Sequence, residues 1–469
     1  MENVKAPLEN LASFAAGLTW DALPKEVQQA AVYRVLDLVT VSVGASGNGL
    51  IEQMKKACRA MDPEPRTKGA VLWGEPEGGL WAPETAAMLN AMLAHTLELD
   101  DVHPSSKVHA SASLIPAAWS LGQALGATGR QVLTAVVAGY ETAFRIGMAL
   151  DVAAHRARGW HATSTCGIFG TAAACGSLLG LDAQHMTWAL GLAGSQAAGV
   201  WAFLEDATNS KVLNPGHAAA DGLRAAFLAK YGMVGPEHIL EAKDGGLLKA
   251  MSNGGHLEKV TAGLGTDWEI LHMDMKPYPC CRSAHGGVDG ALQLRKKLVQ
   301  LLGEAASPEA ILAKVAHLDV GTYKIGYQQC AVSSGCLNPQ NSLDAKFSLP
   351  YTLACALLYG KIDLSSFTDD MVTNPHVRVL MDKIQVQEAP DLTTQYPAHW
   401  SCRLQLALTD GRTLDSFIQD PSGSYRKPLD KETVLQKAVG LLAHVYKNKA
   451  EDKAQELLNL ADQEVLPKI

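Results

Sequence analysis

Between residues 85 and 255 the chain is an almost unbroken series of helical patterns, and this series most constrains the fold. Each pattern covers about ten to twenty residues and ends at glycine, proline or aspartate, as at Gly126 and Gly180. Alanine has the highest helix propensity, and runs such as 172–174 let helix backbones approach closely. We therefore predict a large all-helical domain in this part of the 469-residue chain.

The pattern changes after Gly265. Residues 311–325 alternate between the two faces of a predicted strand, and residues 402–408 and 412–417 do the same on either side of Asp410-Gly411. An Asp-Gly pair between two alternating runs is a strong hairpin signal. These strands predict a β-sheet in the second half of the chain.

Helices are predicted at 284–302 and 351–359, among these strands, and again at 431–460. We interpret 268–424 as a smaller α/β (α+β) domain. Residues 1–267 form the first part of the helical domain, and the helices of 425–469 pack back on it and complete it. The expected fold class is therefore mainly α, with a helical domain formed by both chain ends.

The composition excludes several classes of protein. A net charge of −8, without a basic run, argues against a nucleic-acid partner or an anionic membrane surface. No stretch is apolar over the roughly 20 residues of a membrane-spanning helix, and the first residues do not resemble a secretory signal. Nine cysteines, an odd number, fit reduced thiols. We expect a cytoplasmic enzyme.

Chemistry is concentrated in residues 95–109, His-Thr-Leu-Glu-Leu-Asp-Asp-Val-His-Pro-Ser-Ser-Lys-Val-His, which hold three carboxylates, three imidazoles and one lysine. The spacing predicts a helix that reaches about Asp100 and is stopped by Pro104. A loop through Lys107 follows, before a second helix over 111–125. Titratable groups between two apolar helices are typical of an active site, and a solvated helix end with hydrogen-bonded core histidines is the alternative.

Three other stretches could contribute to such a site. His161 precedes three hydroxyl residues at the start of a helix, where free N–H groups suit a carboxylate; an N-cap cluster is the alternative. Lys211 and His217 lie on either side of a predicted Pro-Gly turn and could both contribute to the site. The alternative is that Lys211 is an ordinary surface lysine. Lys276 and Arg282 lie where the helical region gives way to α/β, and a planar guanidinium suits a substrate carboxylate.

Cofactor motifs are absent from the sequence. Cys280 and Cys281 have no second pair at metal-binding spacing, and no three cysteines are placed as iron–sulfur ligands. There is no glycine-rich phosphate loop, Gly-x-Ser-x-Gly elbow or His-Glu-x-x-His sequence. These absences disfavour a dinucleotide enzyme, a kinase and a serine hydrolase. We expect no metal and no cofactor.

Six ordered stretches stand out together: Leu-Pro-Lys-Glu-Val27, Leu-Glu-Leu-Asp-Asp-Val-His103 with His109, Gly-Trp-His161, 211–217, Lys-Pro-Tyr-Pro-Cys-Cys-Arg282 and Ala345-Lys-Phe-Ser-Leu-Pro-Tyr351. Together they resemble the MmgE/PrpD family, which includes 2-methylcitrate dehydratase, cis-aconitate decarboxylase and iminodisuccinate epimerase. The resemblance covers nearly the whole chain. It implies a helical domain made from both chain ends, a smaller α/β lid inserted before the last helices, a homodimer, and a cofactor-free site between domain and lid.

By the same resemblance, His109, His161, Lys211 and Lys276 fall on family active-site positions and Tyr323 on a lid tyrosine. The other site residues are assigned from the chemistry of their side chains. The predicted catalytic residues are Asp100, Asp101, His109, His161 and Lys211, and the predicted substrate-binding residues are Glu98, His103, Lys276, Arg282 and Tyr323. A histidine would transfer the proton while an aspartate orients it, and the cationic side chains would hold substrate carboxylates. The usual family sequence Asp-Phe-Asp-Asp-Thr is Glu-Leu-Asp-Asp-Val in this chain, which lengthens one carboxylate and deletes one hydroxyl.

The leading hypothesis is a cofactor-independent lyase that dehydrates a small hydroxy-polycarboxylate, as 2-methylcitrate dehydratase does. Decarboxylation of the cis-aconitate type is the first alternative. An epimerase of the iminodisuccinate type, which returns a proton to the opposite face of one carbon, is the second. A binding protein on a family scaffold that has lost its activity is the alternative outside enzymology.

Overall fold

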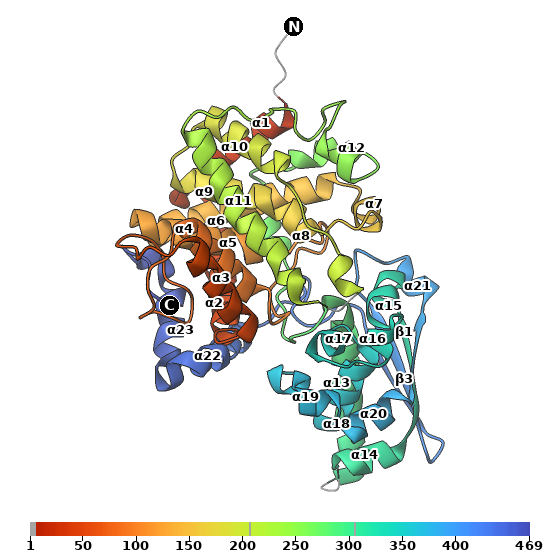
Figure 1. The fold of residues 1–469 in the computed structure, drawn as a ribbon. Helices are drawn as coiled ribbons and strands as arrows, with labels where there is room; N and C mark the ends of the chain where they lie inside the picture. The colour runs from red at the N-terminus through yellow and green to blue at the C-terminus, as the bar shows by residue number, and fades with distance from the viewer. Residues whose placement is uncertain (1–5, 206–207, 304–305) are drawn as a thin grey trace. The chain divides into compact units, whose positions relative to one another are not determined.

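The computed structural model describes residues 6–205, 208–303 and 306–469. The chain divides into two compact units: unit 1 is Met1–Met275 with Asp430–Ile469, and unit 2 is Lys276–Leu429. The corresponding boundaries predicted from the sequence are 268 and 425. Helices predominate in Figure 1, with one small sheet, and this confirms the predicted fold class.

Unit 1 is helical. Its helices from the first part of the chain are α1 (Pro7–Gly17), α2 (Lys25–Gly44), α3 (Gly49–Met61), α4 (Pro83–Ala94), α5 (Ser111–Leu125), α6 (Gly129–Ala149), α7 (Val152–Ala157), α8 (Ala162–Thr165), α9 (Gly167–Leu178), α10 (Ala183–Ser195), α11 (Leu213–Lys230) and α12 (Leu247–Met251). The last part of the chain adds α22 (Lys431–Tyr446) and α23 (Ala450–Leu458).

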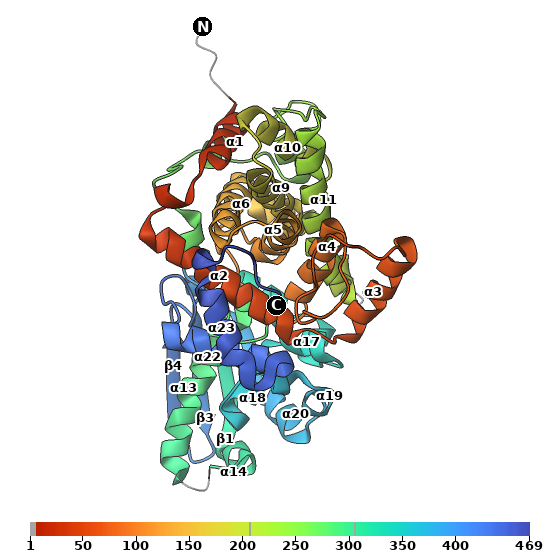
Figure 2. The ribbon, with the colours of Figure 1, turned by 90° about the vertical axis from the view of Figure 1, so that its left-hand side faces the viewer.

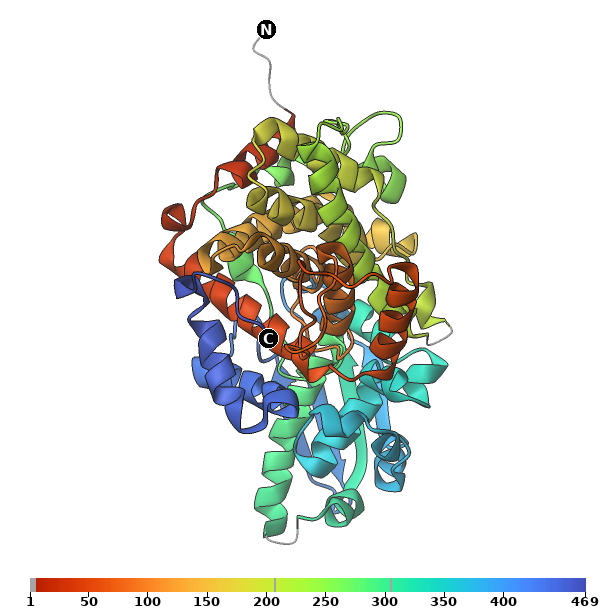
Figure 3. The same ribbon diagram turned by 60° about the vertical axis from the view of Figure 1, so that its left-hand side comes forward.

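The two ends of the chain meet in unit 1. Helices α22 and α23 pack against α2, and Figure 3 shows these blue C-terminal helices beside the red α2. The Gly129 N–H at the start of α6 donates to the Gln463 carbonyl, at 2.8 Å. These contacts confirm that both chain ends build the helical domain.

Helices α5, α6 and α9 pack together at the centre of unit 1, and Figure 2 views them almost end-on. A capping box made by Thr128 and Gln131 starts α6. Helices α6 and α9 approach closely where Gly139 faces Gly170, because a Cβ on either glycine would lie 2.7 Å from the carbonyl oxygen of the other. Helices α4 and α11 pack against each other beside this centre.

Unit 2 combines a sheet with helices. Its elements are α13 (His285–Leu302), α14 (Pro308–Lys314), β1 (Val315–Thr322), α15 (Lys324–Cys330), α16 (Ser334–Leu337), α17 (Ser342–Lys346), α18 (Leu349–Tyr359), α19 (Asp369–Val372), α20 (Pro375–Met381), β2 (Ile384–Glu388), α21 (Pro390–Thr393), β3 (Cys402–Leu408) and β4 (Thr413–Ile418).

The strand order is β2-β1-β3-β4, with β1 parallel to β2 and the other pairs antiparallel. Along β3 the even-numbered residues are buried while Arg403 and Gln405 are exposed, so one face of the sheet packs on the core. Leu404 and Leu406 share that core with Val288 and Leu294 of α13 and with Leu353 of α18.

Several sequence predictions are confirmed. Helix α5 covers the predicted 111–125, α13 and α18 cover 284–302 and 351–359 to within two residues, and β3 and β4 form the predicted hairpin. Gly411 adopts φ +86°, which a side chain at that turn position would disfavour.

Other predictions are wrong or incomplete. The strand predicted over 311–325 is confined to β1, because α14 occupies its start and α15 its end. A register shift between Val315 and His317 places both Val315 and Leu318 toward the core. The helical run predicted over 431–460 is interrupted at Lys447, which has φ +50°. Helix α3 and strand β2 were not predicted.

The helix predicted to reach Asp100 ends at Ala94, six residues earlier. Its C-cap is His95, and Glu98 adopts a left-handed φ of +58° that no helix continues. The turn predicted at Pro215 and Gly216 is also wrong, because these two residues lie in the first turn of α11.

Among the described residues, no single helix is long and apolar enough to cross a membrane. The pair α2 and α3 meets the length and composition test only jointly, and these two helices are bent by 91° relative to each other.

Candidate active site

The candidate site in unit 1 is built around the loop between α4 and α5. The His103 N–H donates to the Val108 carbonyl at 3.0 Å, and Val102 pairs with Asp274 through two backbone hydrogen bonds. Glu98 and Lys107 both adopt left-handed φ values, +58° and +61°. Such conformations are uncommon outside glycine and are maintained by surrounding contacts, often at functional sites.

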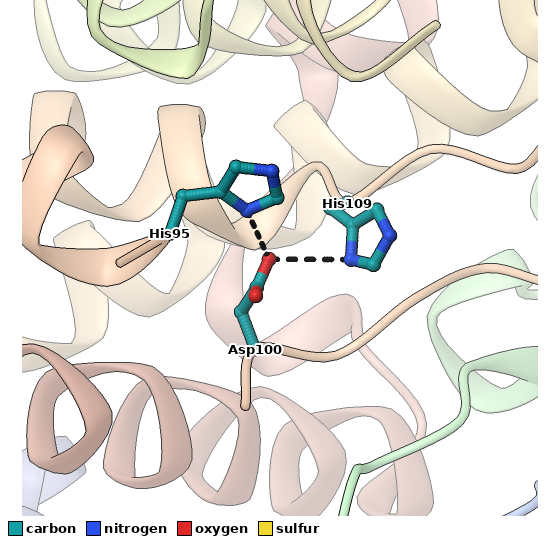
Figure 4. Close-up of side chains that lie close together, drawn as sticks. All are labelled: His95, Asp100 and His109. Atoms are coloured by element: carbon teal, nitrogen blue, oxygen red, sulfur yellow. Dashed lines mark hydrogen bonds and ion pairs between the residues drawn. The ribbon is translucent and has the colours of Figure 1, made fainter. Parts of the chain in front are cut away.

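Asp100 joins two histidines of this loop (Figure 4). Its Oδ2 atom lies 2.7 Å from Nδ1 of His95 and 3.2 Å from Nδ1 of His109. The His109 Nδ1 atom also lies 2.6 Å from the backbone carbonyl of Asp101. Asp100 and His95 are buried, whereas the His109 side chain remains 19% exposed.

This geometry determines where the hydrogen lies on the His109 ring. Its Nδ1 faces a carboxylate and a carbonyl oxygen, which only accept hydrogen bonds, so Nδ1 carries the hydrogen. The Nε2 atom is therefore the nitrogen that can exchange a proton with a substrate. An aspartate that holds Nδ1–H of a histidine is the arrangement that orients a catalytic imidazole in acyl-transfer enzymes.

His95 is a neutral donor in this arrangement. Burial lowers its pKa to about 3, against the opposing effect of Asp100. Its Nδ1–H donates to Asp100, and its Nε2 is buried without a hydrogen-bond partner among the described residues. The ring centroids of His95 and His109 are 5.3 Å apart.

His161, at the start of α8, supplies a third imidazole. Its ring centroid is 6.0 Å from that of His95 and 4.7 Å from the Trp201 ring. The Asn214 amide donates to its Nδ1 at 3.0 Å and to the Val200 carbonyl at 3.2 Å, which fixes the amide orientation. Burial and the neighbouring imidazoles hold the pKa of His161 well below its ordinary value. The ring is therefore neutral, with its hydrogen on Nε2.

Lys211 and Glu98 form a buried ion pair near these imidazoles. Lys211 lies in the 3₁₀ helix η3 (Asn209–Val212), which leads into α11, and both side chains are at least 94% buried. The Lys211 ammonium acts electrostatically on His95, since it contributes to lowering the pKa of that imidazole. The structure thus brings together Glu98, Asp100, His109, His161 and Lys211 from the predicted site residues.

The Asp101 side chain faces a different environment. Its Oδ1 accepts a hydrogen bond from the Ser111 hydroxyl at 2.5 Å, and that hydroxyl also lies 2.5 Å from the Tyr140 hydroxyl. Burial raises the pKa of Asp101 to about 7. Asp101 contacts His109 through its backbone carbonyl, so its side chain is placed to support the loop.

Asp101→Asn tests this role through the pH dependence of stability. The folded pKa of about 7 exceeds the ordinary 3.8, so the folded chain keeps a proton that the unfolded chain releases between these values. This contribution to stability is complete below pH 4 and is lost as the pH rises to 7. The asparagine side chain does not titrate at this position. The free energy of unfolding of the variant, relative to that of the unmodified protein, should therefore increase by a few kcal/mol between pH 4 and pH 8.

The measurement is urea-induced unfolding of both proteins at pH 4, 6 and 8. Because the two proteins share all other titrating groups, the difference between their free energies of unfolding at each pH reports the protonation of Asp101. A pH-independent difference would contradict a neutral, buried Asp101.

His103 has both ring nitrogens occupied. Its Nδ1 accepts the backbone N–H of Ser106 at 3.3 Å, and its Nε2 lies 3.1 Å from the Glu269 carboxylate. The ring stacks on Phe144, with centroids 4.3 Å apart. These contacts anchor the loop, and they leave neither nitrogen open to the substrate-binding role predicted for His103.

Three other predicted substrate-binding residues, Lys276, Arg282 and Tyr323, lie in unit 2. Lys276, the first residue of unit 2, is buried. The Arg282 guanidinium donates to the Ser422 carbonyl at 2.9 Å and to Nδ1 of His285 at 3.0 Å. Tyr323 stacks on Tyr396, with centroids 4.6 Å apart. The Tyr323 side chain is buried.

Two groups in the described part of unit 1 have metal-ligating atoms within 4.8 Å of one another. One is Asp267, Glu269 and His272, and the other is His95, Asp100 and His109. In the second group, a metal ion would have to replace the hydrogen on His109 Nδ1 and break its contact with the Asp101 carbonyl. The hydrogen-bonded arrangement therefore suits proton transfer better than metal binding.

Sequence reasoning did not assign roles to His95 or Asn214. Both were visible as polar residues in helical contexts, but their partners are Asp100 and His161. The second of these pairs spans 53 positions. No local pattern reports a contact of that kind.

The chain is similar to several characterised proteins. It is 28% identical to cis-aconitate decarboxylase of Aspergillus terreus over 440 residues, which cover 90% of this chain and 86% of that protein. It is 27% identical to cis-aconitate decarboxylase of Mus musculus over 467 residues, 98% and 91% of the two chains. It is 26% identical to 2-methylcitrate dehydratase of Cupriavidus necator over 254 residues, which cover 53% of this chain and 49% of that protein.

Family profiles match most of the chain. The MmgE/PrpD N-terminal domain matches residues 9–259, within unit 1, and the MmgE/PrpD C-terminal domain matches residues 278–463. With the fold and the full-length relatives, these matches confirm the resemblance seen in the sequence: the chain belongs to the MmgE/PrpD family.

Proposed function

We propose that this protein is a lyase that works without a cofactor and removes carbon dioxide from a small polycarboxylate of the cis-aconitate type. The relatives named cis-aconitate decarboxylase align with 90% and 98% of the chain, and the dehydratase of Cupriavidus necator aligns with 53%. This difference supports the decarboxylase alternative over the dehydratase that the sequence analysis favoured.

One observation carries the proposal: the Asp100 carboxylate and the Asp101 carbonyl hold Nδ1 of His109, so its Nε2 is the nitrogen that exchanges protons. A decarboxylase must protonate the carbanion that the departing carbon dioxide leaves, and a positioned imidazole performs this step well. The side chain is also the most exposed of the three clustered imidazoles, whose other members are His95 and His161.

The proposed reaction balances as follows. The bond between the departing carboxylate and its neighbouring carbon breaks, carbon dioxide leaves, and the electron pair stays on the substrate. The proton on Nε2 of doubly protonated His109 then forms the new C–H bond, and the imidazole becomes neutral with its hydrogen on Nδ1. The Asp100 carboxylate, 3.2 Å from Nδ1 of His109, holds the Nδ1 hydrogen in place while Nε2 gives up its proton.

Negative charge that spreads onto a remaining carboxylate needs donors. His161 offers an Nε2–H, because its Nδ1 accepts from Asn214. Lys211 offers a buried ammonium. Donors in a site that excludes water stabilise developing charge by several kcal/mol, roughly 3 to 4 for one oxyanion-type contact.

Dehydration is the second candidate, because the same groups could perform it. His109 Nε2 would take a proton from the carbon beside a carboxylate, and the Nε2–H of His161 would protonate the leaving hydroxide. The partial match to 2-methylcitrate dehydratase supports this candidate.

Proton NMR in deuterated water distinguishes these reactions. We would incubate the purified protein separately with cis-aconitate, 2-methylcitrate, citrate and iminodisuccinate. Itaconate or another decarboxylated product, with deuterium at the protonated carbon, is the expected result. An alkene formed from a hydroxy acid would establish the dehydratase instead, and deuterium in an otherwise unchanged substrate would establish an epimerase. No reaction across the panel would contradict the proposal.

We expect turnover to be unchanged after dialysis against EDTA. The reason is that Nδ1 of His109 donates to oxygen atoms instead of presenting a lone pair to a metal. The measurement compares kcat before dialysis, after dialysis, and after separate additions of Zn²⁺, Mn²⁺ and Fe²⁺. Loss of activity that one of these ions restores would instead assign His95, Asp100 and His109 as metal ligands.

A further inference from the structure

The backbone around His161 is fixed by a second segment of unit 1. The His161 N–H donates to the Gly199 carbonyl at 3.0 Å. Trp160 and Val200, the adjacent residues, pair as an antiparallel bridge. The two short segments are therefore held against each other, and they give the His161 side chain a defined origin.

Asn214, the second residue of α11, holds the ring of this histidine. Its Nδ2 atom lies 3.0 Å from Nδ1 of His161 and 3.2 Å from the Val200 carbonyl oxygen. The amide nitrogen has two hydrogens, one for each of these acceptors. Turning the amide over would bring its oxygen against the Val200 carbonyl oxygen, and both of these atoms only accept. The Asn214 amide therefore donates, and Nδ1 of His161 accepts.

Gly199 allows Asn214 to approach this closely. It adopts φ +110°, and a Cβ at this position would lie 2.7 Å from Cβ of Ser164 and 3.2 Å from Cγ of Asn214. The Ser164 hydroxyl donates to the Asn214 backbone carbonyl at 2.9 Å, which joins α8 to the start of α11. The contact between Asn214 and His161 is thus maintained by the packing of three segments of the chain.

The surroundings of the His161 ring oppose a positive charge on it. The side chain is buried, and its ring centroid lies 4.7 Å from that of Trp201. The Arg156 guanidinium lies over the same Trp201 ring, 4.4 Å from its centroid, so a cation is already present nearby. Burial is the largest cause of the low pKa of His161; the neighbouring imidazoles and Arg156 add to it, and Asp100 opposes it.

A neutral imidazole held in this way donates a hydrogen bond but is a poor proton carrier. Its Nε2 already has a hydrogen, so this nitrogen has no lone pair with which to accept a proton. Loss of the Nε2 proton would leave an anion, which burial disfavours. Neutral histidines polarise substrate oxygens by hydrogen bonding in other enzymes.

We propose that Asn214 is a positioning residue that keeps His161 a neutral donor, so that His161 binds a substrate carboxylate through its Nε2–H and transfers no proton. The inference rests on the proposed function, because it assigns the acceptor of this hydrogen bond to the substrate. It leaves His109 as the proton carrier among the three clustered imidazoles. It also argues against dehydration with His161 as the acid and against epimerisation with His161 as the base.

The position of the hydrogen on His161 can be measured without turnover. We would label the histidines with ¹⁵N and assign the His161 signals by NMR as those missing from His161→Gln. We expect an unprotonated Nδ1 and a protonated Nε2 at pH 7. In Asn214→Asp the carboxylate accepts instead of donating, so Nδ1 should gain a hydrogen. Asn10→Asp adds the same charge at an exposed residue of α1 and should leave the His161 signals unchanged.

Turnover separates hydrogen bonding by His161 from proton transfer. Glutamine can place an amide N–H near the position of Nε2 but cannot carry the proton, and leucine can do neither. His161→Leu should lower kcat by about a hundredfold or more, the usual effect of removing one donor to developing charge, and His161→Gln should stay within about tenfold of the unmodified protein. Asn214→Asp should lower kcat by about tenfold or more, because the wrong tautomer turns a lone pair toward the substrate.

A hydrogen on Nδ1 of His161 in the unmodified protein would overturn the inference, as would an unchanged tautomer in Asn214→Asp. Equal losses of kcat in His161→Gln and His161→Leu would show that His161 carries the proton and would also overturn it. If none of the substrates in the NMR panel reacts, the proposed reaction fails, whereas the tautomer measurement still decides the role of Asn214. Circular dichroism establishes that each variant is folded.

Discussion

Replacing His109 by alanine is expected to lower kcat by about a hundredfold or more, the usual contribution of a positioned acid–base group. The reason is geometric: the ring is the imidazole whose Nδ1 is held by Asp100 and the Asp101 carbonyl, so its Nε2 is placed to deliver the proton. The measurement is steady-state turnover of whichever substrate reacts in the NMR panel, with circular dichroism to establish that the variant is folded.

His217→Ala is the matched control. His217 lies on α11 with a half-exposed side chain, and its Nδ1 lies 3.7 Å from the Asp221 carboxylate. Its replacement should leave kcat within about threefold of the unmodified value, as expected for a surface site. Equal losses in His109→Ala and His217→Ala would contradict the assignment of His109.

Asp100→Asn tests whether the carboxylate acts through the histidine. It should also lower kcat, because the Nδ1–H groups of His95 and His109 lose the charged carboxylate that accepts from them. Adding Asp100→Asn to His109→Ala should cause little further loss, since residues that act as a unit are not additive. Additive losses would indicate a separate role for Asp100 in the reaction.

The second large effect is expected at Lys211. Lys211→Met should lower kcat by about a hundredfold or more, because it removes a cation that stabilises developing negative charge. It should also destabilise the protein by about 3 to 5 kcal/mol, since the buried Glu98 carboxylate loses the Lys211 ammonium. A loss of activity in this single variant could therefore reflect unfolding.

The double variant Lys211→Met with Glu98→Gln separates the two effects. It removes both charges of the ion pair, so most of the lost stability should return. Activity should not return, because the cation is still missing. The measurements are the free energy of unfolding in urea and kcat for the single and double variants. Recovery of kcat in the double variant would assign Lys211 a structural role.

The sequence predicted the elements whose signals are local. Helix α5 matches its predicted range because the apolar spacing of 111–125 ends at Gly126, whose left-handed φ of +68° terminates the helix. The hairpin of β3 and β4 was predicted because Asp410-Gly411 specifies a turn between two alternating runs. Family stretches spread over the whole chain predicted the two-part fold.

Predictions failed where tertiary contacts compete with local patterns. The apolar spacing of α4 continues to Leu99, but the helix ends at Ala94 because His95 and Glu98 make contacts that a helix would prevent. The strand over 311–325 was shortened by α14 and α15, whose helical residues fit an alternating pattern equally well over a few positions.

For the site, the residue types and their concentration in one loop, with His161 and Lys211, could be predicted from the sequence. The packing of the helices was needed to show which nitrogen of His109 is held, that Asn214 fixes the hydrogen on His161, and that Glu98 pairs with Lys211. The physical reason is distance along the chain. Spacing patterns describe residues within a few turns of one another, whereas these contacts depend on how whole helices pack.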